Sequence, residues 1–167
     1  MISKPVIRET SLFVGRIKCH TCKKKIATEH LLYFNGRIYC PTCGDKVLAR
    51  YNRDIKKADS PEWLKFQAAC ENALIDAYEA AEKTDDGGTC NRDCTFIEWP
   101  RVNQVALSIA LERAGVHGSV QKWFGSTGVM VYTPPVGQGN KNADAAEAMT
   151  AVFKKFGYKA HTWCQMD

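Results

Sequence analysis

The amino-acid sequence predicts an α+β protein that has a small metal-binding part followed by a larger mixed part. Three observations predict it: two pairs of cysteines near the N-terminus, a change in net charge near residue 58, and alternating helical and strand periodicity beyond that point. At 167 residues, the chain is long enough for one domain and a small module. We expect a basic module over residues 1–57, a linking amphipathic helix over 58–87 and an α+β domain over 88–167.

The first element contains two C-x2-C pairs, Cys19 with Cys22 and Cys40 with Cys43, separated by seventeen residues. Two such pairs can close around one tetrahedral Zn²⁺, because each short turn directs two thiolates at a common point. Buried thiols or disulfides are the alternative. Disulfides require an oxidising compartment, and no run of residues resembles a signal peptide or a membrane span. We therefore expect a Zn²⁺ site in a cytoplasmic protein that does not bind membranes.

The segment between the cysteine pairs predicts a β-hairpin. Residues 31–34 and 37–40 are rich in apolar side chains and flank Asn35-Gly36, which is typical of a type I′ turn because both central residues need positive φ. After the second pair, Asp45 is placed to cap a helix that runs to about Lys57. A knuckle, a hairpin and a second cysteine pair at a helix start predict a treble-clef zinc finger.

Positive charge is concentrated in this first part. Residues 1–57 hold thirteen Lys or Arg against four Asp or Glu, a net charge of +9, whereas residues 58–167 have a net charge of −4. Lysines that only keep a small module soluble are one explanation, and a surface for nucleic acid or for an acidic protein is the other. Clustering after the first knuckle and along one helix face favours the second explanation. The expected contact residues are Lys23, Lys24, Lys25, Arg37, Arg50, Arg53 and Lys57.

The cysteine spacing is similar to that of GATA-type fingers, and Cys40-Pro41-Thr42-Cys43-Gly44 before a basic helix resembles their second knuckle. The resemblance covers residues 19–57 and implies bound zinc and a helix that enters the DNA major groove. Residues 26–30 replace the aromatic-Arg segment of that family, so the resemblance concerns the zinc fold more than base recognition. Four thiolates complete a structural site, so we expect His20 and His30 at the surface and not as ligands.

From residue 58 the sequence predicts a long helix and then the order β-α-β-β-α-β. Ser60 and Pro61 mark the start of the long helix, which continues to about Lys83. Its apolar stripe is expected to face a core: Trp63, Phe66, Cys70, Ala73, Leu74, Ala77, Tyr78 and Ala81. The later elements are expected at 95–99, 102–114, 119–124, 129–133, 143–156 and 158–165. This order predicts a ferredoxin-like domain whose first and last strands are antiparallel neighbours, with the long helix covering the other sheet face or linking to the finger.

A glycine-rich loop is a candidate anion site. Residues 137–142 run into a helix N-terminus, where unpaired N–H groups and the helix dipole favour negative charge. Lys141 would add a full charge, and Gly139 would let a ligand approach the backbone; Gly137 and Asn140 complete the candidate set. The ligand would be an anionic small molecule or a nucleotide. The loop is neither a Walker loop nor a dinucleotide-binding loop, so an ordinary capped turn is the alternative.

A second metal site is also conceivable, from Cys90, Cys94, His161 and Cys164. The paired outer strands would bring Cys94 near Cys164, but residues three apart on a strand point to opposite faces, so His161 and Cys164 would not converge. Free thiols that pack as small apolar groups are the alternative. Cys90 with Asp93 and either His117 or His161 could form a catalytic thiol site. No catalytic signature surrounds Cys90, so we expect no enzyme.

Short segments at residues 88–91 and 137–140, and the ending Gln165-Met166-Asp167, resemble uncharacterised proteins of tailed phages. The resemblance covers much of residues 88–167 and implies an accessory protein that acts on nucleic-acid machinery. The predicted function is a non-enzymatic zinc-binding protein whose basic finger contacts nucleic acid or an acidic protein surface. Its second domain would form a homodimer or bind a partner, and binding of an anionic small molecule is the alternative function.

Overall fold

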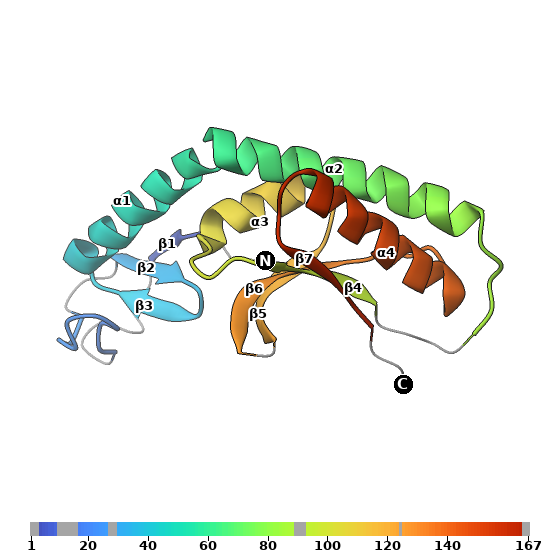
Figure 1. The fold of residues 1–167 in the computed structure, drawn as a ribbon. Helices are drawn as coiled ribbons and strands as arrows, with labels where there is room; N and C mark the ends of the chain where they lie inside the picture. The colour runs from blue at the N-terminus through green and yellow to red at the C-terminus, as the bar shows by residue number, and fades with distance from the viewer. Residues whose placement is uncertain (1–3, 10–16, 27–29, 89–92, 124, 165–167) are drawn as a thin grey trace. The chain divides into compact units, whose positions relative to one another are not determined.

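The chain forms two units, Met1–Lys57 and Ala58–Asp167, which we call the N-terminal unit and the C-terminal unit (Figure 1). The structure is a computed structural model that describes residues 4–9, 17–26, 30–88, 93–123 and 125–164. Within these ranges it contains four helices and two antiparallel sheets. The α+β class that the sequence predicts is therefore confirmed.

The N-terminal unit contains a three-stranded sheet in the order β1-β2-β3 and one helix. The bounds are β1 (Val6–Glu9), β2 (His30–Phe34), β3 (Arg37–Tyr39) and α1 (Pro41–Lys57). The predicted hairpin is confirmed, because β2 pairs with β3 and both turn residues have positive φ, 48° at Asn35 and 70° at Gly36. Strand β1 was not predicted from the sequence. It is only four residues long and pairs with the edge of β2 that β3 leaves open, and such a contact between distant segments cannot be read from the local sequence.

Helix α1 begins earlier than predicted. It starts at Pro41, directly after Cys40, so Asp45 lies inside the helix and the prediction that it caps the helix is wrong. Proline suits the first turn of a helix because its missing N–H has no partner there. Gly44 lies inside α1, where an added Cβ would come within 3.0 Å of the Cβ of Leu32. The small residue therefore lets α1 pack closely against β2.

The C-terminal unit follows the predicted order of helices and strands. Its four strands form one sheet in the order β5-β6-β4-β7, with every neighbouring pair antiparallel. The prediction that the first and last strands pair is confirmed by β4 and β7. The bounds are α2 (Pro61–Glu82), β4 (Cys94–Glu98), α3 (Gln104–Arg113), β5 (Gly118–Trp123), β6 (Ser126–Tyr132), α4 (Asn140–Lys155) and β7 (Ala160–Trp163).

Helix α2 packs against α3 and α4, so all three helices cover the same face of the sheet (Figure 1). The prediction that α2 might cover the opposite face is wrong. Ser60 occupies the N-cap position and Pro61 follows it, as predicted, although the Ser60 hydroxyl makes no capping hydrogen bond. The predicted stripe is buried except for Tyr78, which is 45% exposed, and Leu74, which is partly buried. Ala77 already contacts the core, and Tyr78 lies about 100° further around the helix.

The two faces of the sheet belong to different clusters. Alternate strand residues Ile97, Val129, Val131 and Ala160 join the helices in one core. The opposite face carries a smaller cluster in which Cys94, Phe96 and Met130 are buried and Trp123 and Trp163 are partly buried. Gly128 belongs to this second face, and its lack of a side chain leaves room for the Phe96 ring.

Candidate metal centre

The first cysteine pair is held by a tight turn of the N-terminal unit. The backbone N–H of Cys19 donates to the Lys24 carbonyl (2.9 Å), and the N–H of Lys23 donates back to the Cys19 carbonyl (3.0 Å). Lys18 and Lys25 form an isolated antiparallel bridge at the base of this turn. Lys23 has φ of 61°, a left-handed conformation that reverses the chain directly after Cys22. The turn therefore presents Cys19 and Cys22 on one side, as the C-x2-C motif predicts.

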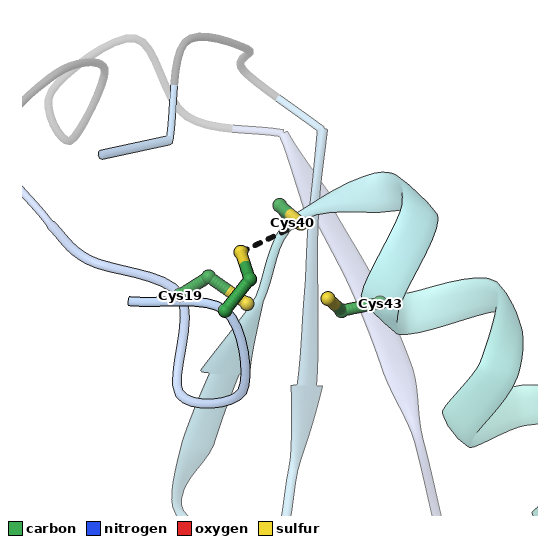
Figure 2. Close-up of side chains that lie close together, drawn as sticks. Cys19, Cys40 and Cys43 are labelled. Atoms are coloured by element: carbon green, nitrogen blue, oxygen red, sulfur yellow. Dashed lines mark hydrogen bonds between the residues drawn. The ribbon is translucent and has the colours of Figure 1, made fainter. Parts of the chain in front are cut away.

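The second pair lies where β3 ends and α1 begins. Cys40 precedes the helix, and the N–H of Gly44 donates to its carbonyl (2.7 Å), which sets the first helical turn and places Cys43 beside Cys40. The two pairs come together because the N–H of His20 donates to the Ile38 carbonyl in β3 (2.8 Å). Figure 2 shows Cys19, Cys40 and Cys43 around a common centre.

The sulfur atoms have the spacing of a metal cluster. All four Sγ atoms lie within 4.8 Å of one another, and those of Cys22 and Cys40 are 3.9 Å apart (dashed line in Figure 2). Four sulfurs about 2.3 Å from a tetrahedral zinc ion are about 3.8 Å from each other. A disulfide would require about 2.05 Å. The cysteines are free thiols, so the disulfide alternative does not describe this cluster.

Electrostatics at the cluster favour a bound cation. Burial raises the pKa of the Cys19 thiol, but backbone hydrogen bonds from Cys40, Cys22 and Thr21 outweigh burial and lower that pKa to about 6. The pKa of Cys43 is raised to about 12 by its hydrogen bond to Cys40, by burial and by the neighbouring thiols. If all four thiols lost their protons, the negative charges would repel one another unless a positive ion lay between them. A metal ion supplies that charge, and a thiol that coordinates it is deprotonated outright. The residues fit a metal ion such as zinc.

The chemistry of the ligand set indicates a structural site. Four cysteine ligands leave a tetrahedral ion with no open position for a substrate, whereas catalytic zinc sites keep one. Among the residues that the structure describes, this is the only group of three or more Cys, His, Asp or Glu side chains close enough to hold a metal ion. His20 is not part of it. The His20 ring packs edge-on against Tyr39, and its pKa is lowered by burial and by the charges of Arg37 and Lys23.

The predicted basic contact residues are all exposed: Lys23, Lys24, Lys25, Arg37, Arg50, Arg53 and Lys57. Arg50, Arg53 and Lys57 follow one another at helical spacing along α1. The mostly buried Asp54 makes long ion pairs with Arg50 (3.8 Å) and Lys57 (3.6 Å). The side chains of Arg50 and Lys57 are themselves largely exposed, so both cations stay accessible to a partner.

The glycine-rich loop in the C-terminal unit is filled by the chain itself. Helix α4 begins at Asn140, whose N–H donates to the Gly87 carbonyl (2.7 Å), and the N–H of Gln138 donates to the Asp86 carboxylate (3.0 Å). Gly139 has φ of 54°, and an added Cβ would lie 2.8 Å from the carbonyl carbon of Gly87. We expected a ligand to approach the backbone of Gly139 closely, but residues 87–88 of the chain itself occupy that position. With a carboxylate at the loop, the geometry does not favour an anion.

The second cysteine set does not form a metal-binding group among the residues that the structure describes. The Cys94 thiol is buried with Phe96 and Met130, and its pKa is raised to about 12 by burial and by Asp93 and Cys164. The His161 side chain is on this same face, 3.2 Å from Glu98. Cys164 follows the last residue of β7, and its thiol contributes to the raised pKa of Cys94. Among the described residues the free-thiol alternative is therefore favoured for Cys94. Cys90, the candidate nucleophile, lies outside the described residues.

Comparison with protein-family models, with curated proteins and with solved structures found no match for this chain. The resemblances to GATA-type fingers and to phage proteins therefore stay at the level of short sequence patterns. Among the helices that the structure describes, none combines the length and the apolar composition needed to cross a membrane. What the fold and the site define is an α+β protein with a four-cysteine cluster in its N-terminal unit that could hold a metal ion.

Proposed function

We propose that this protein is a non-enzymatic zinc-binding protein whose N-terminal unit presents a basic surface to nucleic acid. The observation that carries the proposal is the four-cysteine cluster, with exposed cations in the first knuckle and in the helix that carries its last ligand. Cys19, Cys22, Cys40 and Cys43 would hold the ion. The knuckle, the β2–β3 hairpin and the cysteine pair at the start of α1 support a treble-clef finger.

In this proposal the zinc ion has a mechanical role. Lys23, Lys24 and Lys25 are attached to the first cysteine pair, and Arg50, Arg53 and Lys57 to the helix that begins at the second. One ion bonded to both pairs holds the two groups of charges in a fixed arrangement. A polyanion then gains several phosphate contacts without ordering a flexible segment, and each contact releases counterions from the nucleic acid.

The C-terminal unit is proposed as a ferredoxin-like domain that forms a homodimer or binds a partner. The order β4-α3-β5-β6-α4-β7 and the antiparallel pairing of β4 with both β6 and β7 support this assignment. With an acidic balance over residues 58–167, the C-terminal unit is a poorer candidate than the N-terminal unit for nucleic-acid contact. A cytoplasmic location remains a prediction from the sequence.

The test is the salt dependence of binding to duplex DNA, single-stranded DNA and RNA, measured by fluorescence anisotropy with the zinc-loaded full chain. If the basic residues contact about six phosphates, affinity should fall by about a thousandfold between 50 and 200 mM salt. Arg53→Ala should weaken binding and reduce the magnitude of the log–log salt slope by about one. Lys83→Ala, which removes an exposed cation from the C-terminal unit, is the matched control. Absence of binding at low salt would overturn the nucleic-acid proposal and leave an acidic protein surface as the partner.

A further inference from the structure

The outer side of helix α2 carries large apolar side chains. Leu64 is 46% exposed, Ile75 57% and Tyr78 45%, and these are three of the four exposed large apolar side chains in the described part of the C-terminal unit. The fourth, Tyr132, lies on the sheet, and its hydroxyl is hydrogen-bonded to Ser119 (2.7 Å). Scattered exposed apolar residues are ordinary on a protein surface, whereas a group of them on one element indicates an interaction site.

These side chains belong to a regular seam along the helix, which we call the α2 seam. Its positions alternate in spacing between four and three residues: Leu64, Ala68, Glu71, Ile75, Tyr78 and Glu82. This is the spacing with which one helix packs along another. With 3.6 residues per turn, the seam lies on the side of α2 away from the buried Phe66, Ala73 and Ala77. Helices α3 and α4 pack on that buried side and leave the seam uncovered (Figure 1).

Negative charge accompanies the α2 seam. Helix α2 contains five Asp or Glu residues and a single Lys. Glu71 and Glu82 lie in the seam and Glu79 borders it, and no ion pair neutralises these three carboxylates among the residues that the structure describes. The C-terminal end of a helix favours cations because of the helix dipole, yet the last turn of α2 contains no basic residue before Lys83 at the C-cap. The seam would therefore attract a positively charged partner.

We propose that the α2 seam binds a basic amphipathic helix of a partner protein. The inference rests on the partner-binding role proposed for the C-terminal unit, and it names the surface and the chemistry of the partner. Apolar side chains of the partner helix would pack on Leu64, Ile75 and Tyr78, and its Lys or Arg side chains would pair with the carboxylates. The same carboxylates repel nucleic acid and anionic membranes. They also disfavour a second copy of α2, because Glu71 lies near the middle of the seam and would meet its own counterpart.

The test is fluorescence anisotropy with the zinc-loaded full chain and a labelled helical peptide of Leu and Lys in heptad spacing, about eighteen residues long to match the seam. The wild-type chain should bind this peptide and should not bind the same peptide with Glu in place of Lys. Ile75→Ser should weaken binding by about ten- to a hundredfold, because one large apolar side chain is no longer buried. Ile7→Ser, the same substitution at a 63% exposed position of the N-terminal unit, is the matched control and should bind like the wild type.

Folding of the Ile75→Ser variant is checked separately. All four tryptophans lie between residues 63 and 163, so their fluorescence reports unfolding of the C-terminal unit alone. The thermal midpoint should stay at the wild-type value, because the Ile75 side chain is exposed. Nucleic-acid binding by the N-terminal unit should also be unchanged in Ile75→Ser, so this inference and the nucleic-acid proposal can fail separately.

Charge variants give a second readout. Glu79→Gln and Glu82→Gln should each weaken peptide binding by up to about fivefold at low salt, whereas Glu62→Gln, which neutralises an exposed carboxylate on another side of α2, should not. Equal binding of the Lys and Glu peptides, or unchanged binding in Ile75→Ser, would overturn the proposal. A full chain that is dimeric in light scattering, and that Ile75→Ser converts to a monomer, would also overturn it and assign the seam to a second copy.

Discussion

Replacement of Cys40 by alanine tests the reasoning about the N-terminal unit most directly. The substitution removes one of the four sulfur atoms of the cluster, which lies 3.9 Å from the Cys22 sulfur. We expect the described part of the N-terminal unit to unfold and the C-terminal unit to remain folded. Among the described residues of the N-terminal unit, few apolar side chains form its buried core: Cys19, Ile26, Leu31, Leu32 and Tyr39.

The magnitudes decide this outcome. Each fully buried large apolar side chain contributes about 1.5–3 kcal/mol, whereas ordering the backbone opposes folding by about 1–2 kcal/mol per residue. Structural zinc contributes about 10–16 kcal/mol to a zinc-finger peptide at neutral pH. That contribution is comparable to the whole stability of an ordinary domain, about 5–15 kcal/mol. With so few buried apolar side chains, the described part of the N-terminal unit should therefore unfold when tetrahedral metal coordination is lost.

The assay combines elemental analysis, an amide correlation spectrum and tryptophan fluorescence. In Cys40→Ala the amide signals of residues 30–57 should collapse toward random-coil positions and the retained zinc should fall, while the thermal midpoint seen by tryptophan stays at the wild-type value. Thr42→Ala is the matched control, because Thr42 is exposed and lies between the two ligands Cys40 and Cys43. Dispersed amide signals in Cys40→Ala, or in wild-type protein stripped by a chelator, would refute the reasoning.

Three further predictions concern single residues. Gly128→Ala should destabilise the C-terminal unit by about 1–3 kcal/mol in urea unfolding, because the new Cβ would meet the Ile97 carbonyl and lie 2.6 Å from the Phe96 ring; an unchanged midpoint would contradict this. The hydrogen bond from Lys159 holds the pKa of Glu98 below its usual value. Its stabilising contribution is therefore present above the unfolded-state pKa and lost as pH falls through the lower folded-state pKa. The stabilities of wild type and Glu98→Gln should therefore converge only below that folded-state pKa, which lies under the usual value for a glutamate. Gly36→Ala should weaken the hairpin by about 1 kcal/mol through its positive φ alone, since an added Cβ would meet no atom within 4 Å; NMR shifts of β2 and β3 would report it.

Local sequence patterns predicted the elements that depend on near neighbours. The C-x2-C pairs, the Asn35-Gly36 turn and the periodicity of the helices each involve residues a few positions apart, so their conformations follow from local sterics and hydrogen bonding. The four candidate metal ligands were identified in this way, and the structure brings their sulfur atoms together. Helix starts were less well predicted, because α1 and α4 both begin a few residues earlier than the sequence suggests.

Contacts between distant segments were decided only by the tertiary structure. Strand β1 forms by pairing with the edge of β2, and α2 is held in place by packing against α3 and α4. Residues 86–88 fill the loop that had been considered as an anion site. Sequence by itself identified the four thiols that could bind a metal ion in the N-terminal unit. The tertiary structure decided the register in which β4 pairs with β6 and β7, because register is a property of two segments and not of either one alone.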